Sequence, residues 1–199
     1  MNMKDVIKRL EASCRLAELT AHVLAVPSAE IAKVRDVLPL SAELEEWYLN
    51  GAPTGFEIPW SVEWLSLYHP AELIERQEGY RWTSGVGGPV DPHWDPAWLL
   101  IGDCSGDAII ADTGAQGTPV FYAFHGESIV SLIPMAPDIS SFLATLAIWI
   151  GVRCVRFKKG ARNEDGTLRQ DLFEEFALQL RRWQALPPEY IDVLGDYVN

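Results

Sequence analysis

Three aspartates in one short segment are the residues of this chain most suited to chemistry. Asp103, Asp107 and Asp112 all lie within residues 98–112. Hard divalent cations take several carboxylate oxygens, so such a group could serve a metal-dependent hydrolase. The spacing does not match a calcium-binding EF-hand loop, however, and tight turns use Asp and Gly without any ligand. A turn is the simpler interpretation, and we expect no metal and no other cofactor.

A thiol and an imidazole form a second candidate group, with Cys104 as nucleophile and His125 as base. No third group orients this pair and no helix N-terminus lies beside the thiol, whereas a free cysteine is commonly a small buried hydrophobe. The other histidines, His22, His69 and His93, have no zinc-ligand spacing. We therefore expect no catalytic residue and a protein that is not an enzyme.

Two further patterns could bind phosphate. Residues 85–88 are glycine-rich, but no strand precedes them, no helix follows and no lysine is near, which favours a flexible loop. A basic cluster could bind nucleic acid, but beside an acidic domain such charges more often form a solvated face or pair internally. Its members are Arg153, Arg156, Lys158, Lys159 and Arg162.

The aspartate segment must be positioned by strands. Runs of strand-forming residues at 98–101 and 108–111 flank a Gly- and Asp-rich stretch, which predicts a β-hairpin. Apolar runs at 120–124 and 128–133 follow, and no crossover helix separates them. The pattern predicts a meander of about four antiparallel strands.

Helices are expected on both sides of this meander, from apolar periodicity, capping residues and proline or glycine stops. Further strands are expected at 56–60 and 64–68, and Tyr80–Pro96 forms the main irregular stretch. The predicted fold class is α+β, a central mainly antiparallel sheet with helices packed around it. The predicted helices are 5–24, 28–35, 42–50 after Ser41, 71–78, Asp138 or Ser140 to about 150, a helix to about 183 after a Thr167–Gln170 capping box, and 189–197.

Length and composition suit one intracellular domain. The chain has 199 residues, 48% of them hydrophobic, and its three cysteines are far apart, which argues against a disulfide framework. Charges near the N-terminus replace the apolar stretch of a signal peptide, and the apolar run 142–152 is too short to cross a bilayer. We expect a cytoplasmic protein with no membrane partner.

The formal charge of −12 is unevenly distributed. Residues 41–150 contain fifteen acidic and two basic side chains, whereas residues 151–182 contain eight basic and five acidic ones. A negative field over the sheet region repels nucleic acid and anionic membranes and attracts cationic partners. The alternative is that it only keeps the protein in solution, and the sequence does not decide between the two.

The order of elements resembles the SUKH superfamily, in the branch of the fungal cell-wall-assembly regulator and bacterial toxin-immunity proteins. The resemblance covers about residues 28–148 of a single domain, so the N-terminal helix 3–26 and the C-terminal helical extension 151–199 lie outside it. Its most specific part is Ile101-Gly102 followed by Gly106-Asp107 and Asp112. The other matching segments are Leu38-Pro39, Asn50-Gly51, residues 62–65 leading to Pro70, residues 120–125 and residues 141–143.

The resemblance implies the same α+β fold and a non-catalytic binding protein, most often an immunity protein that neutralises a secreted nuclease or deaminase toxin domain. A nuclease site is basic because it holds phosphates, so an acidic surface could occupy it. An intracellular regulatory adaptor in cell-envelope or stress control is the alternative, and a metal-dependent hydrolase is a third. We take Trp47, Trp64, Trp98 and Trp149 as core. The expected partner-binding residues are Trp82, Asp91, Trp94, Asp95, Asp103, Asp107 and Asp112.

Overall fold

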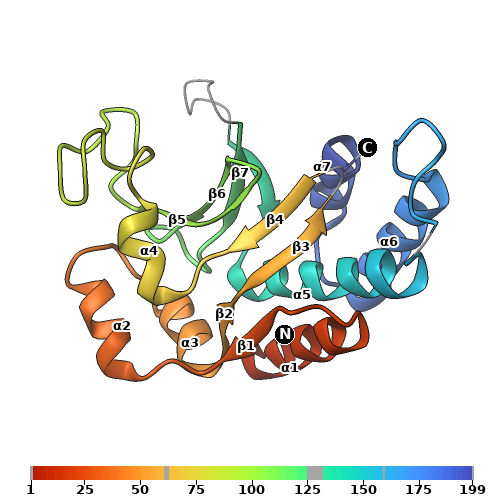
Figure 1. Cartoon of the computed structure of the whole chain (residues 1–199), viewed down its shortest axis with the longest axis horizontal. Coiled ribbons are helices and arrows are strands. Elements are labelled where there is room, and N and C mark those ends of the chain that lie inside the picture. The colour runs from red at the N-terminus through yellow and green to blue at the C-terminus, as the bar shows by residue number, and fades with distance from the viewer. Residues whose placement is uncertain (1, 61–62, 125–131, 159, 199) are drawn as a thin grey trace.

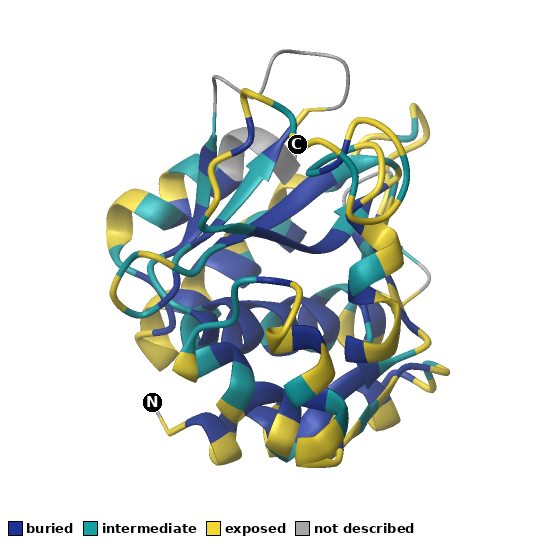
Figure 2. Cartoon of the chain, turned by 90° about the vertical axis from the view of Figure 1, so that its left-hand side faces the viewer, coloured by how far each residue is buried: buried dark blue, intermediate teal, exposed yellow. Residues whose placement is uncertain are grey.

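The structure is a computed structural model that describes residues 2–60, 63–124, 132–158 and 160–198. It has the predicted α+β architecture, with an antiparallel sheet above a buried helix and further helices around both (Figure 1). Buried residues gather where the sheet meets the helices below it, and exposed residues lie on the outer helix faces and loops (Figure 2).

The main sheet contains six strands in simple sequence order, and its first two confirm the strands predicted at 56–60 and 64–68, the second with a shift of one residue. Each strand pairs antiparallel with the next one along the chain, so the sheet has two edges, at β3 and at β8. The strands are β3 (Phe56–Trp60), β4 (Glu63–Leu67), β5 (Trp98–Cys104), β6 (Asp107–Asp112), β7 (Val120–Ala123) and β8 (Ile133–Ala136). The strand predicted at 128–133 falls largely on residues outside the described part of the chain.

The predicted hairpin is confirmed as β5 and β6, with a tighter turn than expected. Cys104 pairs with Asp107, so only Ser105 and Gly106 form the turn. Both have positive φ, 53° and 99°, the conformation of the two-residue turns that match strand twist. A bulge between Leu100 and Gly102 shifts the register of β5 against β6.

The N-terminal helix is shorter than predicted. Helix α1 (Met3–Leu16) is capped by Asn2, whose side chain accepts a hydrogen bond from Lys4 N at 2.9 Å. Beyond it Glu18 has a φ of 57°, which ends the helix. The rest of the predicted helix contains β1 (His22–Leu24), which pairs with β2 (Ala52–Thr54). The prediction was wrong here because tertiary strand pairing overrides a local helical pattern.

Several helices begin at the expected residues. Ser41 Oγ accepts from Leu44 N at 3.1 Å and caps α3 (Ala42–Gly51). Asp138 Oδ1 accepts from Ser141 N at 2.7 Å and caps α5 (Ile139–Ile150), which settles the choice between Asp138 and Ser140. Two other predicted helices are confirmed: α2 (Ser28–Arg35) has the predicted bounds, and α4 (Pro70–Arg76) begins one residue and ends two residues before the predicted 71–78.

The C-terminal extension is helical, as predicted, but the predicted Thr167–Gln170 capping box does not form. Helix α6 (Gln170–Trp183) has Arg169 as its N-cap with no side-chain cap bond. The Thr167 hydroxyl instead donates to Asp165 at 2.6 Å. A π-helix, η1 (Gly151–Arg156), continues α5, and α7 (Pro188–Val198) ends the chain.

Helix α5 occupies the centre of the core. It packs against α1, α6 and β8, so the terminal helices share one hydrophobic cluster with the sheet. Trp149 is fully buried, and its indole N–H donates to the Pro59 carbonyl oxygen of β3 at 2.7 Å. This bond ties the central helix to the edge strand of the sheet.

The continuous helix from Ile139 to Arg156 has 18 residues and is apolar enough to cross a membrane by length and composition. The run 142–152 was expected to be too short, but the helix extends beyond it. Of this helix 61% is buried inside the fold, and the core helix of a globular protein passes the same test.

Candidate partner-binding surface

The two aspartates at the hairpin tip point to opposite faces of the sheet, because Asp103 pairs with Ala108 and Asp107 pairs with Cys104. Each carboxylate accepts a hydrogen bond from a tyrosine. The Tyr68 hydroxyl donates to Asp103 Oδ2 at 2.5 Å, and the Tyr122 hydroxyl donates to Asp107 Oδ2.

Asp103 is also held by the turn itself, since its Oδ1 accepts from Gly106 N at 3.0 Å. Burial first, and then the adjacent Asp103 carboxylate, raise the pKa of the Tyr68 hydroxyl. Tyr68 therefore stays a neutral donor at physiological pH. A neutral donor fixes the Asp103 carboxylate in place without cancelling its charge.

The third aspartate lies far from the other two. Asp112 is five residues beyond Asp107 along β6, roughly 17 Å away at the rise of a strand. It accepts from Gly114 N at 3.0 Å and shapes the next turn. Among the described residues no group of three His, Cys, Asp or Glu side chains could hold a metal ion. The metal-site hypothesis for Asp103, Asp107 and Asp112 is therefore wrong.

The Cys104 thiol has surroundings that oppose its use as a nucleophile. It is 2% exposed, and its Sγ lies 3.7 Å from Glu63 Oε2. Burial first, and then the Glu63 carboxylate, raise its pKa to about 12. Catalytic thiols have lowered pKa values in electropositive surroundings, so this environment is the reverse. Its proposed base, His125, lies outside the described residues.

The two tryptophans expected as partner anchors are buried, at 4% for Trp82 and 3% for Trp94. The Trp94 indole N–H donates to the Trp98 carbonyl oxygen at 3.0 Å, and its ring meets the rings of Trp98 and Tyr80 edge-on. Both indoles thus form the interior of the irregular 80–97 stretch. Neither presents a ring to a partner, so the expectation for these two residues was wrong.

Asp91 and Asp95 act in turns within the same stretch. Asp91 Oδ1 accepts from His93 N, and Asp95 Oδ1 accepts from Ala97 N, each at 2.8 Å. A backbone N–H donor leaves the charge of both carboxylates intact. They lie on the loop beside α4, and their contact with a partner stays a prediction.

The exposed aromatic residue of the sheet is Trp64, which was expected in the core. It is 52% exposed, whereas Trp47 and Trp149 are fully buried as predicted. Trp64 pairs with Pro59 of the edge strand and faces the same side of the sheet as the cross-strand row Glu57, Ser66 and Asp103. We call Glu57, Trp64, Ser66 and Asp103 the acidic sheet face.

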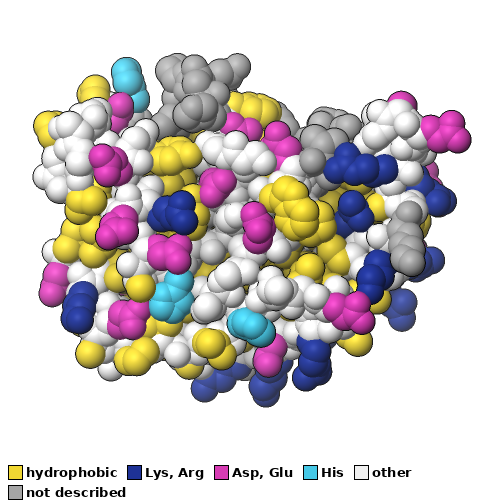
Figure 3. All heavy atoms as spheres, viewed as in Figure 1, with side chains coloured by type: hydrophobic (Ala, Val, Ile, Leu, Met, Phe, Trp, Pro, Cys, Tyr) yellow, Lys and Arg dark blue, Asp and Glu magenta, His cyan; other side chains and the backbone are white. Residues whose placement is uncertain are grey.

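On the face that Figure 3 shows, charged side chains are unevenly distributed, although a few Lys and Arg side chains lie among the acidic ones. Asp and Glu side chains gather over the sheet and α4, and Lys and Arg side chains lie along α1 and towards α6 (Figure 3). None of the ion pairs between described residues involves Glu57 or Asp103. The nearby Arg76 guanidinium instead packs 4.8 Å from the Tyr68 ring centre and pairs with Glu72.

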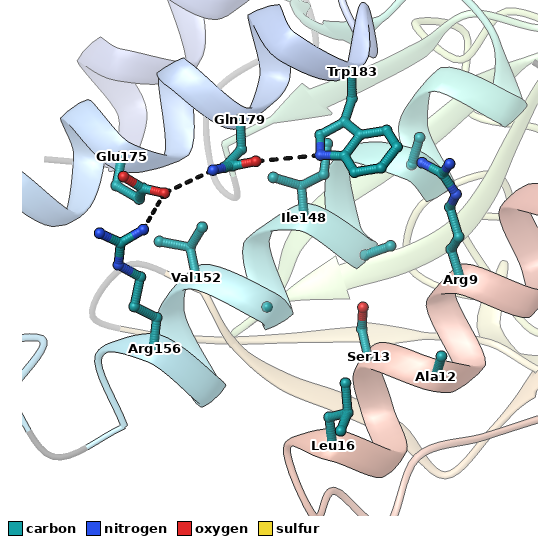
Figure 4. Close-up of a pocket in the computed structure, with 13 residues that line it drawn as sticks. Arg9, Ala12, Ser13, Leu16, Ile148, Val152, Arg156, Glu175, Gln179 and Trp183 are labelled. Atoms are coloured by element: carbon teal, nitrogen blue, oxygen red, sulfur yellow. Dashed lines mark hydrogen bonds and ion pairs between the residues drawn. The ribbon is translucent and has the colours of Figure 1, made fainter.

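A groove of about 410 Å³ lies between α1, α6 and the continuous helix of α5 and η1 (Figure 4). Trp183, which the sequence did not place, is 45% exposed at its rim. The Arg9 guanidinium lies 4.0 Å from the centre of the Trp183 ring, and Arg156 pairs with Glu175. The three walls come from distant parts of the chain, so no local pattern could have revealed this groove.

No family model, no curated protein and no solved structure matches this chain. The SUKH resemblance rests on the order of the motifs alone.

Proposed function

We propose that this chain is a non-catalytic, SUKH-like immunity protein that neutralises a secreted toxin domain of the nuclease or deaminase class. The observation that supports it best is the acidic sheet face, where Trp64 is 52% exposed beside carboxylates that no described cation pairs with. This function requires no cofactor, nucleic acid or membrane, and we place it in the cytoplasm.

The physical argument combines charge with a fixed geometry. A nuclease cleft must hold phosphates and is therefore basic, so an acidic surface is attracted to it and associates quickly. Asp103 is held by Tyr68 and by the turn, so little side-chain freedom is lost on binding. Interface energy concentrates in aromatic residues that fill pockets, and Trp64 offers such a residue.

Co-expression tests the proposal directly. The toxin-like domain encoded beside this chain should lose its toxicity when the wild-type chain is present, and the two purified proteins should form a one-to-one complex. Raising the salt concentration should weaken that complex, because screening removes the attraction between exposed charges. If the chain protects against none of the toxin-like domains encoded beside it, the proposal is contradicted.

A matched pair of variants locates the contact. Glu57→Gln with Asp103→Asn removes two charges from the acidic sheet face and keeps the size of both side chains. Asp36→Asn with Glu46→Gln removes two charges from the exposed surface of the neighbouring helices. The first pair should slow association by about tenfold and the second by less than about twofold. Equal effects contradict a role for the acidic sheet face.

A regulatory adaptor in cell-envelope or stress control is the second candidate function. The groove beside Trp183 favours it, because an adaptor needs a surface for a second partner. Affinity purification separates the two functions. One stoichiometric partner supports the immunity function, and several envelope or signalling proteins support the adaptor.

A further inference from the structure

The groove between the terminal helices has the shape of a short trough. Its walls are α1 from Arg9 to Leu16 and α6 from Glu175 to Trp183, each about 10–12 Å long at the helical rise. Leu16 and Trp183, at its rims, are 68% and 45% exposed, so the trough is open to solvent. Figure 4 shows both walls turned towards the space above Ile148 and Val152.

Small residues make the floor deep. Ala144, Ala147 and Gly151 line it from the central helix, and Ala12 lines it from α1. A Cβ atom added at Gly151 would meet no atom within 4 Å, so the space above this residue is open. The π-helix begins at this glycine, and π-helical turns occur frequently at functional sites.

A side-chain contact lies at each end of the trough. Arg9 of α1 lies over the Trp183 ring at one end, and Arg156 of η1 pairs with Glu175 at the other. Gln179 links the polar groups of the α6 wall, since it donates to Glu175 Oε1 at 2.7 Å and accepts from the Trp183 indole at 3.2 Å.

The charge of the trough is not balanced. Its described lining contains two arginines and one carboxylate, and that carboxylate pairs with Arg156. No described carboxylate pairs with Arg9, whose guanidinium is thus free to meet an anion at the Trp183 end. Exposed charges of both signs lie on the same helices, among them Arg15 and Glu11 of α1 and Arg181 and Glu174 of α6, so the imbalance in the lining rests on Arg9.

We propose that this groove binds an amphipathic α-helix of an acidic partner. The trough spans about two helical turns, which matches apolar side chains at i, i+3 or i+4, and i+7 on one face of a helix. Those side chains lie on the small-residue floor, and a carboxylate of the partner helix meets Arg9. This surface is distinct from the acidic sheet face and takes a partner of opposite charge.

Synthetic peptides of about 18 residues, long enough to form a helix, test the proposal. One peptide has leucines at i, i+4 and i+7 and glutamates on its other faces. Its control has lysine in place of every glutamate. Fluorescence anisotropy should show that the glutamate peptide binds the full chain at least about tenfold more tightly than the lysine peptide.

Variants of the groove make the test specific. Gly151→Leu fills the floor of the groove and should lower the affinity for the glutamate peptide by at least about tenfold. The melting temperature of the variant should not fall below that of the wild-type chain. Arg9→Glu should lower the affinity for the glutamate peptide and raise the affinity for the lysine peptide. Lys8→Glu makes the same charge change at the neighbouring exposed position outside the lining, and should alter either affinity by less than about twofold.

Four outcomes overturn the proposal. The two peptides bind equally, or Gly151→Leu leaves binding unchanged. Dodecanoate binds in the groove while neither peptide does, which assigns the site to an acyl chain. The wild-type chain forms dimers that Gly151→Leu abolishes, which assigns the site to a second copy. Because Trp64 and Asp103 lie on another surface, each result is independent of the proposed immunity function.

Discussion

The acidic sheet face and the groove each present one exposed tryptophan, in opposite surroundings. Trp64 lies on a strand beside carboxylates, and Trp183 lies at a helix end under the Arg9 guanidinium. Their exposures, 52% and 45%, are similar, so the neighbouring charges distinguish the two sites. The formal charge of −12 hides this difference, because it sums the acidic region 41–150 with the more basic segment 151–182.

The two regions also differ in how they are held. The acidic sheet face is set by strand pairing and by buried hydrogen bonds such as that of Gln77, whose side chain joins Leu73 to Leu100. The groove is closed at its ends by exposed contacts of Arg9 and Arg156, which contribute little in water. We infer a preformed sheet surface and a groove whose ends adjust to an occupant.

Substitution by alanine should change the free energy of unfolding in opposite directions at Gly102 and at Gly151. Gly102 should show the larger effect. A Cβ atom at Gly102 would overlap the Ser66 carbonyl oxygen, so Gly102→Ala forces β4 away from β5. The free energy of unfolding should fall by about 2–3 kcal/mol, the usual cost of overpacking. Urea denaturation measures this, and an unchanged midpoint contradicts the rigid sheet.

The tryptophans give the next largest effect, on partner binding. Trp64→Ala should weaken the complex with a basic toxin domain by about 2 kcal/mol, roughly thirtyfold, because it removes an aromatic anchor. Trp183→Ala is the matched control and should leave that complex within about twofold. Both changes remove exposed rings, so circular dichroism should show a folded chain. Equal losses would place the contact elsewhere.

Tyr68, which donates a hydrogen bond to Asp103, makes the free energy of unfolding depend on pH in the alkaline range. Burial, then Asp103, raise the pKa of Tyr68 in the folded chain, so folding favours the neutral hydroxyl. The stabilisation is complete below the unfolded pKa of about 10 and is lost above it, at up to about 1.4 kcal/mol per pH unit. Tyr68→Phe should make the free energy of unfolding less dependent on pH above that value. An unaltered slope contradicts this coupling.

Local chemistry predicted the elements better than it predicted their outward faces. The hairpin and the helix caps need only neighbouring residues. The hairpin and the Ser41 cap are confirmed, and Asp138 is one of the two caps predicted for α5. The outward direction of Trp64 depends on its pairing with Pro59, which local pattern does not fix. Trp82 is buried because the 80–97 stretch folds over it, with Trp82 pairing with Val90 across the loop.

The groove was beyond sequence reasoning for a related reason. Amphipathic patterns predicted the helices that form its walls, but a pattern gives the direction of an apolar face and not the space left between two faces. Gly151 and Ala147 leave that space, and their small side chains carry no signature of binding.

Gly151 should show a smaller effect than Gly102 and of opposite sign. Its φ is helical at −60° and the space around it is open, so Gly151→Ala meets no obstacle. The free energy of unfolding should rise by about 0.5–1 kcal/mol, because alanine loses less backbone entropy in a helix. Thermal denaturation beside Gly102→Ala gives the comparison. A loss of stability at Gly151 contradicts an open groove floor.

The exposed ion pair at the groove end should show the smallest effect. Arg156 pairs with Glu175 while its own side chain is 61% exposed, so Arg156→Ala should lower the free energy of unfolding by less than about 1 kcal/mol. That loss should vanish in about 1 M salt, where charges are screened within about 3 Å. Urea denaturation at low and high salt measures the difference. A larger loss that salt does not change would mean that this end of the groove is as rigid as the sheet, and the contrast between the two regions would then rest on charge alone.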